Sequence, residues 1–265
     1  MFKLTREVRF AVNAQPDAQL AGGRPTNSFG GFPSLTGLGY FFELQVTLAA
    51  ELDPKSSYLL NIKDVDQVVR QRAVPVIDEL VRSRRFGGGG NVVLSLFDLL
   101  RDAWPVAQLA SLRLSLSPLL SLSVHASEHP MVRLSQKFEF SASHRLHSPR
   151  LSDEENRRTF GKCNNPHGHG HNYEVQVTLA GKPDARGVLI DVPAFERIVS
   201  ETVIEPFDHK NLNEEVPAFR DVIPSVENIA QVIYRMLGPK FAAVKATLAS
   251  VTVWETPKTW CEYSE

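Results

Sequence analysis

The chain has 265 residues, of which 43% are hydrophobic and 22% are charged, and its formal net charge is -1. This is the composition of a globular protein with one large domain or two of about 100–150 residues. A near-neutral charge argues against a general nucleic-acid binder, which needs a basic surface. No apolar run reaches the roughly 18 residues of a membrane span. With two cysteines and a charged N-terminus that has no signal-peptide core, we expect a cytoplasmic protein without a disulfide framework.

The sequence repeats itself at an offset of about half its length. Residues 37–49 read GLGYFFELQVTLA, and residues 168–180 read GHGHNYEVQVTLA. Three further pairs match in the same order: residues 9–11 with 139–141, 58–62 with 188–192, and 110–114 with 249–253. Ordered matches of this kind predict two domains of one fold, at residues 1–120 and 132–265, with a polar connector at 121–131.

In the first half, two stripes of apolar residues at helical spacing predict two helices. The first stripe is Val65, Val68 and Val69, and the second is Leu96, Leu99, Leu100 and Ala103.

The second half shows the same pattern more fully. Strands are expected at residues 134–143, 173–180, 246–254 and 260–263. Pro193 opens one amphipathic helix, and Ser225 is the expected N-cap of another. Their apolar stripes are Phe195, Ile198, Val199 and Val203, then Ile229, Val232, Ile233, Met236 and Leu237. The order ββααββ predicts an α+β fold in which an antiparallel sheet carries its helices on one face.

Three histidines of the second half form a candidate metal site. His169 and His171 lie two apart at the start of a strand, so their side chains point to the same face, and His144 ends the first strand. Three imidazoles with an open fourth position are typical of catalytic zinc. The first half has Leu38 and Tyr40 in place of the histidine pair. Because the candidate ligands are missing together from the other half, a zinc site is favoured over a solvated polar turn.

The residues around the histidine pair add detail to this prediction. Gly168 and Gly170 would leave room for an ion close to the backbone. His167 is a weaker ligand candidate, because it lies in the loop before the strand. Opposite His144, the first half has Asn and Ala at residues 13–14.

Two further groups could transfer protons. Cys163 lies in the polar loop before the histidines, where a nearby dication would favour the thiolate as base or nucleophile; the alternative is a buried small hydrophobic residue. Asp208 precedes His209, and a carboxylate can orient an imidazole for proton transfer; the alternative is an ordinary surface pair.

Two glutamates are candidates for substrate binding. Glu255 closes a strand, where its carboxylate could accept two hydrogen bonds from a guanidine-like heterocycle, and its counterpart in the first half is Leu116. Glu227, near the start of the second helix, either stabilises the helix dipole or contributes to the same pocket.

These residues, in this order, resemble the 6-pyruvoyltetrahydropterin synthase family. The matching stretches are residues 140–149, 151–156, 160–166, 168–173, 208–212, 227–228 and 255–256. The resemblance covers about residues 134–265. It implies the tunnelling fold (T-fold), whose subunits assemble into oligomeric barrels, and therefore a homo-oligomer. It also implies a zinc-dependent lyase of tetrahydrobiopterin biosynthesis, which converts 7,8-dihydroneopterin triphosphate to 6-pyruvoyltetrahydropterin and releases triphosphate.

The resemblance assigns roles to the candidate residues. They are the zinc ligands His144, His169 and His171, the proton-transfer set Cys163, Asp208 and His209, and the pterin anchor Glu255, with Glu227 as a further substrate contact. Magnesium is left open as a second ion for the triphosphate. The chain departs from the family at residues 224–226, which read Pro-Ser-Val where threonines are common, and this puts a substrate contact in doubt.

Two other functions stay open. His167 creates a C-x3-HGH spacing typical of 6-carboxytetrahydropterin synthase of the queuosine pathway, whereas Cys163 to His169 and His171 gives the C-x5-HGH of the pyruvoyl enzyme, which we favour. The chain could also be a non-catalytic scaffold that binds zinc or pterin. The first half, which lacks every catalytic counterpart, is expected to be a degenerate T-fold that serves assembly.

Overall fold

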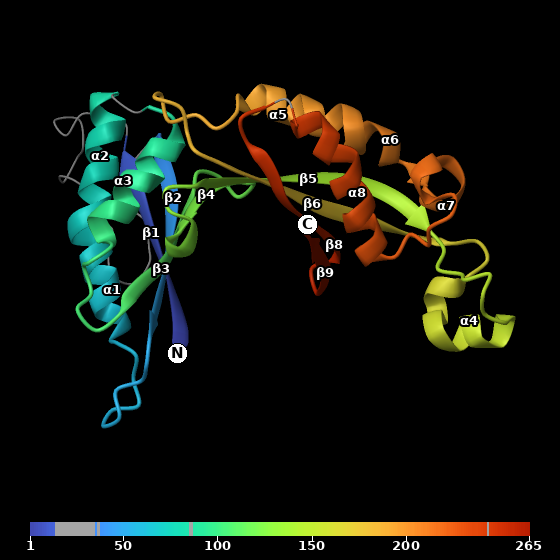
Figure 1. Ribbon diagram of the computed structural model, residues 1–265, viewed down its shortest axis with the longest axis horizontal. Helices are drawn as coiled ribbons and strands as arrows, with labels where there is room; N and C mark the ends of the chain where they lie inside the picture. Colours follow the sequence, from blue (N-terminus) through green and yellow to red (C-terminus); the bar gives the residue numbers. More distant parts are fainter. Residues whose placement is uncertain (14–34, 36–37, 85–86, 243) are drawn as a thin grey trace. The chain divides into compact units, whose positions relative to one another are not determined.

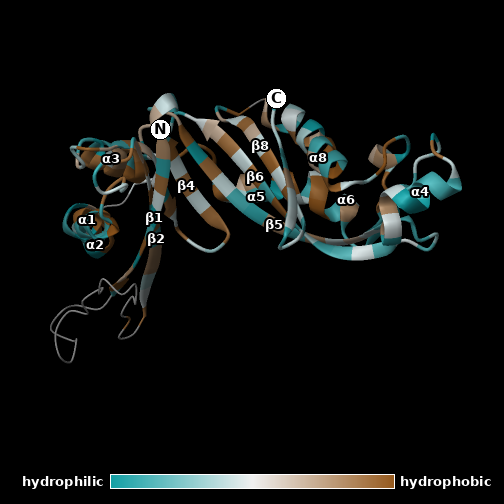
Figure 2. Ribbon diagram, turned by 90° about the horizontal axis from the view of Figure 1, so that it is seen from below, coloured by the Kyte–Doolittle hydropathy of each residue, from teal (hydrophilic) through white to brown (hydrophobic). Residues whose placement is uncertain are grey.

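The computed structural model describes residues 1–13, 35, 38–84, 87–242 and 244–265 (Figure 1). These residues form two compact units, one made of Met1–Leu134 with Gly181–Leu189 and the other of Ser135–Ala180 with Ile190–Glu265. Each unit is a sheet with helices packed on one face, so the predicted α+β class is confirmed (Figures 1 and 2). None of the helices in the described residues is long and apolar enough to cross a membrane.

The first unit carries its strands in the order β1–β2–β3–β4. Its elements are β1 (Phe2–Asn13), β2 (Gly39–Ala50), α1 (Ile62–Val68), a π-helical turn (Val69–Ala73), α2 (Val74–Ser83), α3 (Gly89–Leu100), β3 (Gln108–Ser115), β4 (Leu120–His125) and a 3-10 turn (Ala126–Glu128). Strand β2 alternates as a half-buried strand should, with Leu44, Val46 and Leu48 facing the core.

The predicted helical stripes of this unit are right in position except for two members: Leu99 is exposed, and Ala103 lies beyond the end of α3. Val65 and Val69 are fully buried, and Val68 is only half-buried. In α3 the buried positions are Val93, Leu96, Phe97 and Leu100. Leu99 is 40% exposed, because a buried stripe at spacings of three and four turns residue 99 toward solvent.

The expected polar connector at residues 121–131 is wrong, because Leu120–His125 forms strand β4. Leu122 and Val124 are buried and pair with Leu114 and Leu112 of β3. Serines between the apolar residues give this segment the period of a strand with one face in the core, although its composition is that of a loop.

The second unit carries its strands in the order β5–β6–β8–β9, with β7 beside β5. Its elements are β5 (Val132–His144), α4 (Asp153–Phe160), a 3-10 turn (Gly161–Asn164), β6 (His169–Gly181), α5 (Val192–Val199), a π-helical turn (Ser200–Ile204), α6 (Glu205–Phe207), β7 (Lys210–Asn211), α7 (Leu212–Glu215), a 3-10 turn (Pro217–Phe219), α8 (Val226–Phe241), β8 (Thr247–Thr256) and β9 (Thr259–Tyr263). All four predicted strands and both predicted helices are confirmed within a few residues.

The two predicted helices of this unit, α5 and α8, begin as the sequence predicts. Ser225 accepts a hydrogen bond from the backbone N–H of Asn228 at the start of α8. Pro193 lies in the first turn of α5, and Asp191 caps that helix. Helix α4 was not predicted, although Ser152 and Glu155 form a capping box whose sequence signature is visible in the loop.

The two units share irregularities at matching positions of the repeat. The pairing of β2 with β3 shifts register between Thr47 and Leu48, and the pairing of β6 with β8 shifts between Thr178 and Leu179. In each unit a π-helical turn, Val69–Ala73 or Ser200–Ile204, is followed by a helix with proline in its first turn. Duplication of one fold would leave such shared details, so they favour the prediction that the two halves are copies of one fold.

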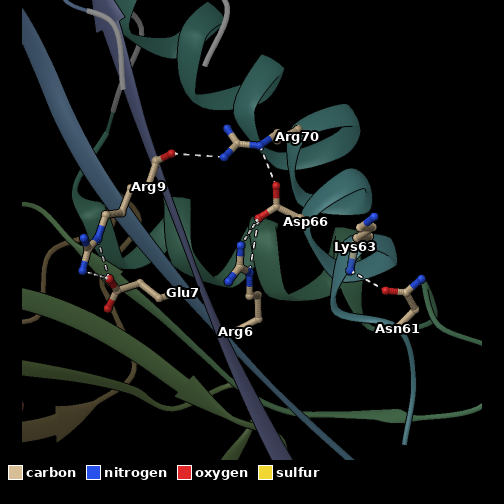
Figure 3. Close-up of polar contacts among 7 residues, drawn as sticks. All are labelled: Arg6, Glu7, Arg9, Asn61, Lys63, Asp66 and Arg70. Atoms are coloured by element: carbon tan, nitrogen blue, oxygen red, sulfur yellow. Dashed lines mark hydrogen bonds and ion pairs between the residues drawn. The ribbon is translucent and has the colours of Figure 1, made fainter. Parts of the chain in front are cut away.

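A buried carboxylate joins the first strand of the first unit to its helices. Figure 3 shows Asp66 of α1 between Arg6 of β1 and Arg70 of the π-helical turn. Asp66 lies 3.1 Å from the Arg6 guanidinium and 2.8 Å from that of Arg70, and its side chain is 1% exposed. Both carboxylate oxygens are therefore used, as the burial of a charge requires.

We expect Asp66→Ala to destabilise the first unit by about 3–5 kcal/mol, because it would leave two guanidinium groups around an empty buried site. Denaturant unfolding of the full chain measures the effect. Asp64→Ala removes an exposed carboxylate of the same helix and is the control, with an expected loss below about 1 kcal/mol. Equal losses in the two variants would show that the ion pairs contribute little.

Candidate metal centre

Four side chains of the second unit converge at one end of its sheet. His144 is the last residue of β5, His169 and His171 begin β6, and Glu255 lies near the end of β8. One ligand atom from each lies within 4.8 Å of the others, so together they could hold a metal ion. The structure thus brings together the three histidines singled out in the sequence and adds the glutamate that was expected to bind substrate.

The spacing of the donor atoms suits a tetrahedral ion. His144 Nε2 lies 3.1 Å from His169 Nε2 and 3.2 Å from Glu255 Oε1, and His171 Nε2 lies 3.4 Å from the same oxygen. Ligands at zinc distances of about 2.0–2.1 Å in a tetrahedron stand roughly 3.3 Å from one another.

A backbone carbonyl far away in the chain, which no sequence pattern reveals, fixes the orientation of His144. Its Nδ1 lies 2.7 Å from the carbonyl oxygen of Pro224, immediately before α8. Because a carbonyl only accepts hydrogen bonds, Nδ1 must carry the proton, and Nε2 presents its lone pair to the centre. The hydroxyl of Tyr173 lies 3.3 Å from the same nitrogen, and both side chains are fully buried. Strand alternation from His171 could have indicated Tyr173.

The other two imidazoles have buried nitrogens that no protein group satisfies. His169 Nδ1 and His171 Nε2 have no hydrogen-bond partner, since the 3.4 Å contact of His171 with Glu255 is too poor in geometry to count as one. Burial, with a smaller contribution from neighbouring imidazoles, lowers the pKa of both histidines. The unsatisfied Nε2 of His171 lies among the other donor atoms, which fits its role as a metal ligand, whereas the unsatisfied Nδ1 of His169 is the ring nitrogen that does not face His144.

Glu255 is held ionised by its neighbours. The contact with the His144 imidazole is the main cause of its lowered pKa, and the charges of the three imidazoles add to it against the opposing effect of burial. Its carboxylate therefore carries a charge that can contact either a metal ion or a cationic heterocycle.

The two glycines beside the histidine pair serve the strands rather than an ion. A Cβ on Gly168, whose φ is +71°, would lie 3.0 Å from the carbonyl oxygen of His144. A Cβ on Gly170 would lie 3.4 Å from the carbonyl oxygen of Ala142. The absence of a Cβ at these two positions allows the start of β6 to approach β5 closely. This approach explains the glycines without a metal ion beside the backbone.

Two cavities flank the four residues. His169 and Cys163 line one of them, and His171 and His209 line the other. The half-buried Cys163 lies in the 3-10 turn after α4, where its carbonyl oxygen accepts a hydrogen bond from Leu146 at 2.9 Å. Neither Cys163 nor His209 belongs to the metal-binding group, so each is placed to act on a molecule bound beside it.

Asp208 and His209 form an ordered pair. Asp208 accepts a hydrogen bond from the backbone N–H of Ser141 at 2.8 Å, and its second oxygen lies 2.7 Å from His209 Nδ1. These two contacts, in that order, lower the pKa of Asp208. The His209 backbone has a φ of +57°, which is costly for this residue type and tends to occur at functional sites. Its side chain is 82% exposed and free to receive a proton at Nε2.

Asparagine side chains hold the Cys163 loop. Asn156 is fully buried and bonds the N–H of Ser148 and the carbonyl oxygens of Ser148, Leu151 and Ser152. Asn164 donates to the carbonyl oxygen of Leu146, and the side chain of Asn213 bonds both the N–H and the carbonyl of Arg145. The loop is therefore tied to the end of β5, where His144 lies.

Two of the predicted residues lie apart from this centre. Glu227 is exposed in the first turn of α8, and its charge adds to the effect of burial in raising the pKa of Cys261. His167 is exposed in the loop and does not belong to the metal-binding group.

The matching end of the first unit has different chemistry. A pocket there is lined almost wholly by apolar side chains, which include Tyr40, Phe42, Leu114 and Leu116. Tyr40 stands at the repeat position of His171 and Leu116 at that of Glu255, and Leu38, at that of His169, is 86% exposed. Asn13, opposite His144 in the repeat, is buried, while Ala14 lies outside the described residues. Within the described part of the chain, the only candidate metal group is the one in the second unit.

Comparison with known proteins identifies the second half. The family model for 6-pyruvoyl tetrahydropterin synthase matches residues 133–265. A human 6-pyruvoyl tetrahydrobiopterin synthase is 47% identical over 125 residues, which are 47% of this chain and 85% of that protein. The chain belongs to this family. A Poecilia reticulata enzyme of the same name is 52% identical over 96 residues, 36% of this chain and 65% of that protein, so the match spans just under two thirds of its length.

A solved structure of the Caenorhabditis elegans 6-pyruvoyl tetrahydropterin synthase is 39% identical, with a TM-score of 0.49 over 51% of this chain and 96% of that one. The residues matched by the family model include all four of the metal-binding group, Cys163, and the Asp208–His209 pair. Membership in the family predicted from the sequence is confirmed.

We expect His169→Ala and His171→Ala each to lower the amount of bound metal substantially, because each variant removes one imidazole donor from the candidate metal-binding group. Elemental analysis of the purified variants measures this. His167→Ala removes a histidine from the same loop and should leave the metal content unchanged. Loss of metal from His167→Ala would instead assign the site to the C-x3-HGH spacing.

Proposed function

We propose that this protein is a zinc-dependent lyase that converts 7,8-dihydroneopterin triphosphate to 6-pyruvoyltetrahydropterin and releases triphosphate. The family membership supports the reaction class and the pterin substrate. The observation that carries the proposal is the convergence of three imidazoles and a carboxylate, with buried imidazole nitrogens that no protein group satisfies.

His144, His169 and His171 would hold the zinc ion, which when bound supplies Lewis-acid polarisation of oxygen atoms on the substrate side chain. Pro224 orients His144, and burial lowers the pKa of His169 and His171, which favours the neutral imidazoles that a metal ion requires. A nitrogen-rich donor set of this kind favours zinc over magnesium or calcium, which prefer oxygen ligands. Magnesium remains a candidate only for the triphosphate.

Cys163, Asp208 and His209 would move the protons. Cys163 lines the cavity on the His169 side and is placed to remove a carbon-bound proton as thiolate. His209 lines the cavity on the His171 side, and Asp208 holds its Nδ1, so Nε2 can exchange a proton with the substrate. As the carbon–hydrogen bond breaks, the electron pair forms a double bond and triphosphate leaves with the electrons of its carbon–oxygen bond. Tautomerisation then gives the pyruvoyl side chain.

Glu255 would anchor the pterin ring by accepting hydrogen bonds from its ring N–H and exocyclic amine. Its present contacts with His144 and His171 make it the fourth member of the metal group. A catalytic zinc ion needs an open position, so in this proposal the carboxylate turns from the metal to the pterin when substrate enters. Glu227, at the surface of α8, would be at most a secondary contact.

The first unit would be a degenerate T-fold, at residues 1–120 of the predicted division, that serves assembly while residues 132–265 perform the chemistry. The matching register shifts and π-helical turns support this origin. We further propose a cytoplasmic homo-oligomer acting in tetrahydrobiopterin biosynthesis, with the small pterin substrate as ligand and neither nucleic acid nor membrane as partner.

The product decides between this function and its alternatives. Zinc-loaded protein incubated with 7,8-dihydroneopterin triphosphate should release triphosphate and form the pyruvoyl product, and a chelator should abolish both. Formation of the carboxy product would identify the 6-carboxytetrahydropterin synthase reaction. Pterin binding without release of triphosphate would identify a non-catalytic scaffold.

Cys163→Ala should retain its zinc and lose turnover by about 10²–10⁴-fold, because it removes a proton-transfer group without touching the metal donors. Cys261→Ala, at the other free thiol, is the control and should keep its activity. Turnover and zinc content are measured on the same preparations. An active Cys163→Ala variant would remove this thiol from the mechanism.

Glu255→Gln should keep zinc but raise KM at least tenfold, because an amide cannot accept both hydrogen bonds of the pterin guanidine-like edge. Steady-state kinetics and elemental analysis separate the two effects. If the variant loses zinc in proportion to its activity, Glu255 is a metal ligand rather than a pterin anchor.

A further inference from the structure

The cavity on the Cys163 side of the metal centre is strongly cationic. It has a volume of about 800 Å³. Its charged and reactive lining residues are Arg145, Asp153, Arg157, Lys162, Cys163 and His169. The lining therefore carries three permanent positive charges and one carboxylate, Asp153, and it also includes Cys163 and His169.

The cations of this cavity are not neutralised by the protein. Within the described residues, Arg157 and Lys162 have no carboxylate partner. Arg145 donates from Nε to the carbonyl oxygen of Asn164 at 3.2 Å, and another of its guanidinium nitrogens lies 3.4 Å from His147 Nδ1, so neither printed contact is with a carboxylate. Isolated surface cations are commonly solvated, but three that converge on one cavity create a potential that attracts an anion.

The backbone that carries these cations is well held. Arg157 lies on α4, whose first turn is fixed by the Ser152–Glu155 capping box, and α4 is the hydrophilic helix that Figure 2 shows in teal. Lys162 lies in the following 3-10 turn, next to Cys163. Arg145 has its backbone clamped by Asn213 through hydrogen bonds of 2.7 and 3.0 Å. An anion entering the cavity would meet cationic side chains that are carried on a fixed backbone.

We propose that this cavity is the triphosphate subsite, in which Arg157 and Lys162, with Arg145, bind the polyphosphate of the substrate. The inference rests on the proposed function for the identity of the anion. In the elimination step the electron pair of the breaking carbon–oxygen bond leaves with triphosphate, so negative charge on the leaving group rises as the proton passes to Cys163. Guanidinium and ammonium groups beside the leaving oxygen stabilise that charge.

The test measures, by calorimetry, the binding of inorganic triphosphate to the zinc-loaded full chain. The R157A/K162A variant should raise the dissociation constant for triphosphate about tenfold or more, because two charge-assisted contacts are lost. The matched control is R150A/R158A, which removes two cations from the same region outside the cavity and should change binding less than about twofold, since such charges are screened. Zinc content is measured after each titration, because triphosphate can itself bind zinc.

Three results would overturn the subsite. They are an absence of triphosphate binding to the unmodified protein at millimolar concentration, equal weakening in the two double variants, and unchanged binding in R157A/K162A. Dihydroneopterin without phosphates provides the second probe, and it should bind all three proteins alike. Triphosphate binding that depends on Arg157 and Lys162 in a protein that forms no pterin product would keep the anion subsite and reject the lyase function. Formation of the pterin product by a protein whose triphosphate binding does not depend on Arg157 and Lys162 would keep the lyase function and reject the anion subsite.

Discussion

The hydrogen bond from His144 Nδ1 to the carbonyl oxygen of Pro224 is the constraint on which the site depends. It ties the last residue of β5 to the entrance of α8, two segments 80 residues apart, and it fixes which imidazole nitrogen carries a proton. With that nitrogen engaged, Nε2 faces His169 and Glu255 at 3.1 and 3.2 Å. A second-layer contact of this kind sets the tautomer and direction of a ligand, and so allows the other donors to be placed around it.

The metal centre divides the second unit between two cavities with different tasks. On one side, Cys163 stands among cations that suit a polyphosphate leaving group. On the other side, the Asp208–His209 pair stands at the end of a strained backbone turn beside His171. Cys163 and His209, to which we assign proton transfer, thus line two different cavities beside the histidines. In the first unit the matching end has become apolar, so the repeat that conserves the sheet has not conserved its chemistry.

Much of the fold could be predicted because it follows from periodicity and end signals. Alternation in residues 173–180, Pro193 in a first helical turn and the N-cap Ser225 predicted main elements of the second unit, and all of them formed. The errors in the predicted elements arose where residue composition was weighed above hydrophobic periodicity and capping signals. Strand β4 was mistaken for a connector because of its serines, and α4 was passed over in a polar loop although its capping box was legible.

The sequence by itself determined the family, the strand and helix order, and the three histidines, because ligand spacing in a strand is a local property. Only the tertiary structure decided that Glu255 joins the histidines, that Pro224 and Tyr173 orient His144, and that Gly168 serves the approach to β5. It also decided that Arg145, Arg157 and Lys162 share one cavity. The reason is physical: these relations join segments far apart in the chain, and their geometry exists only once the sheet and α8 have packed together.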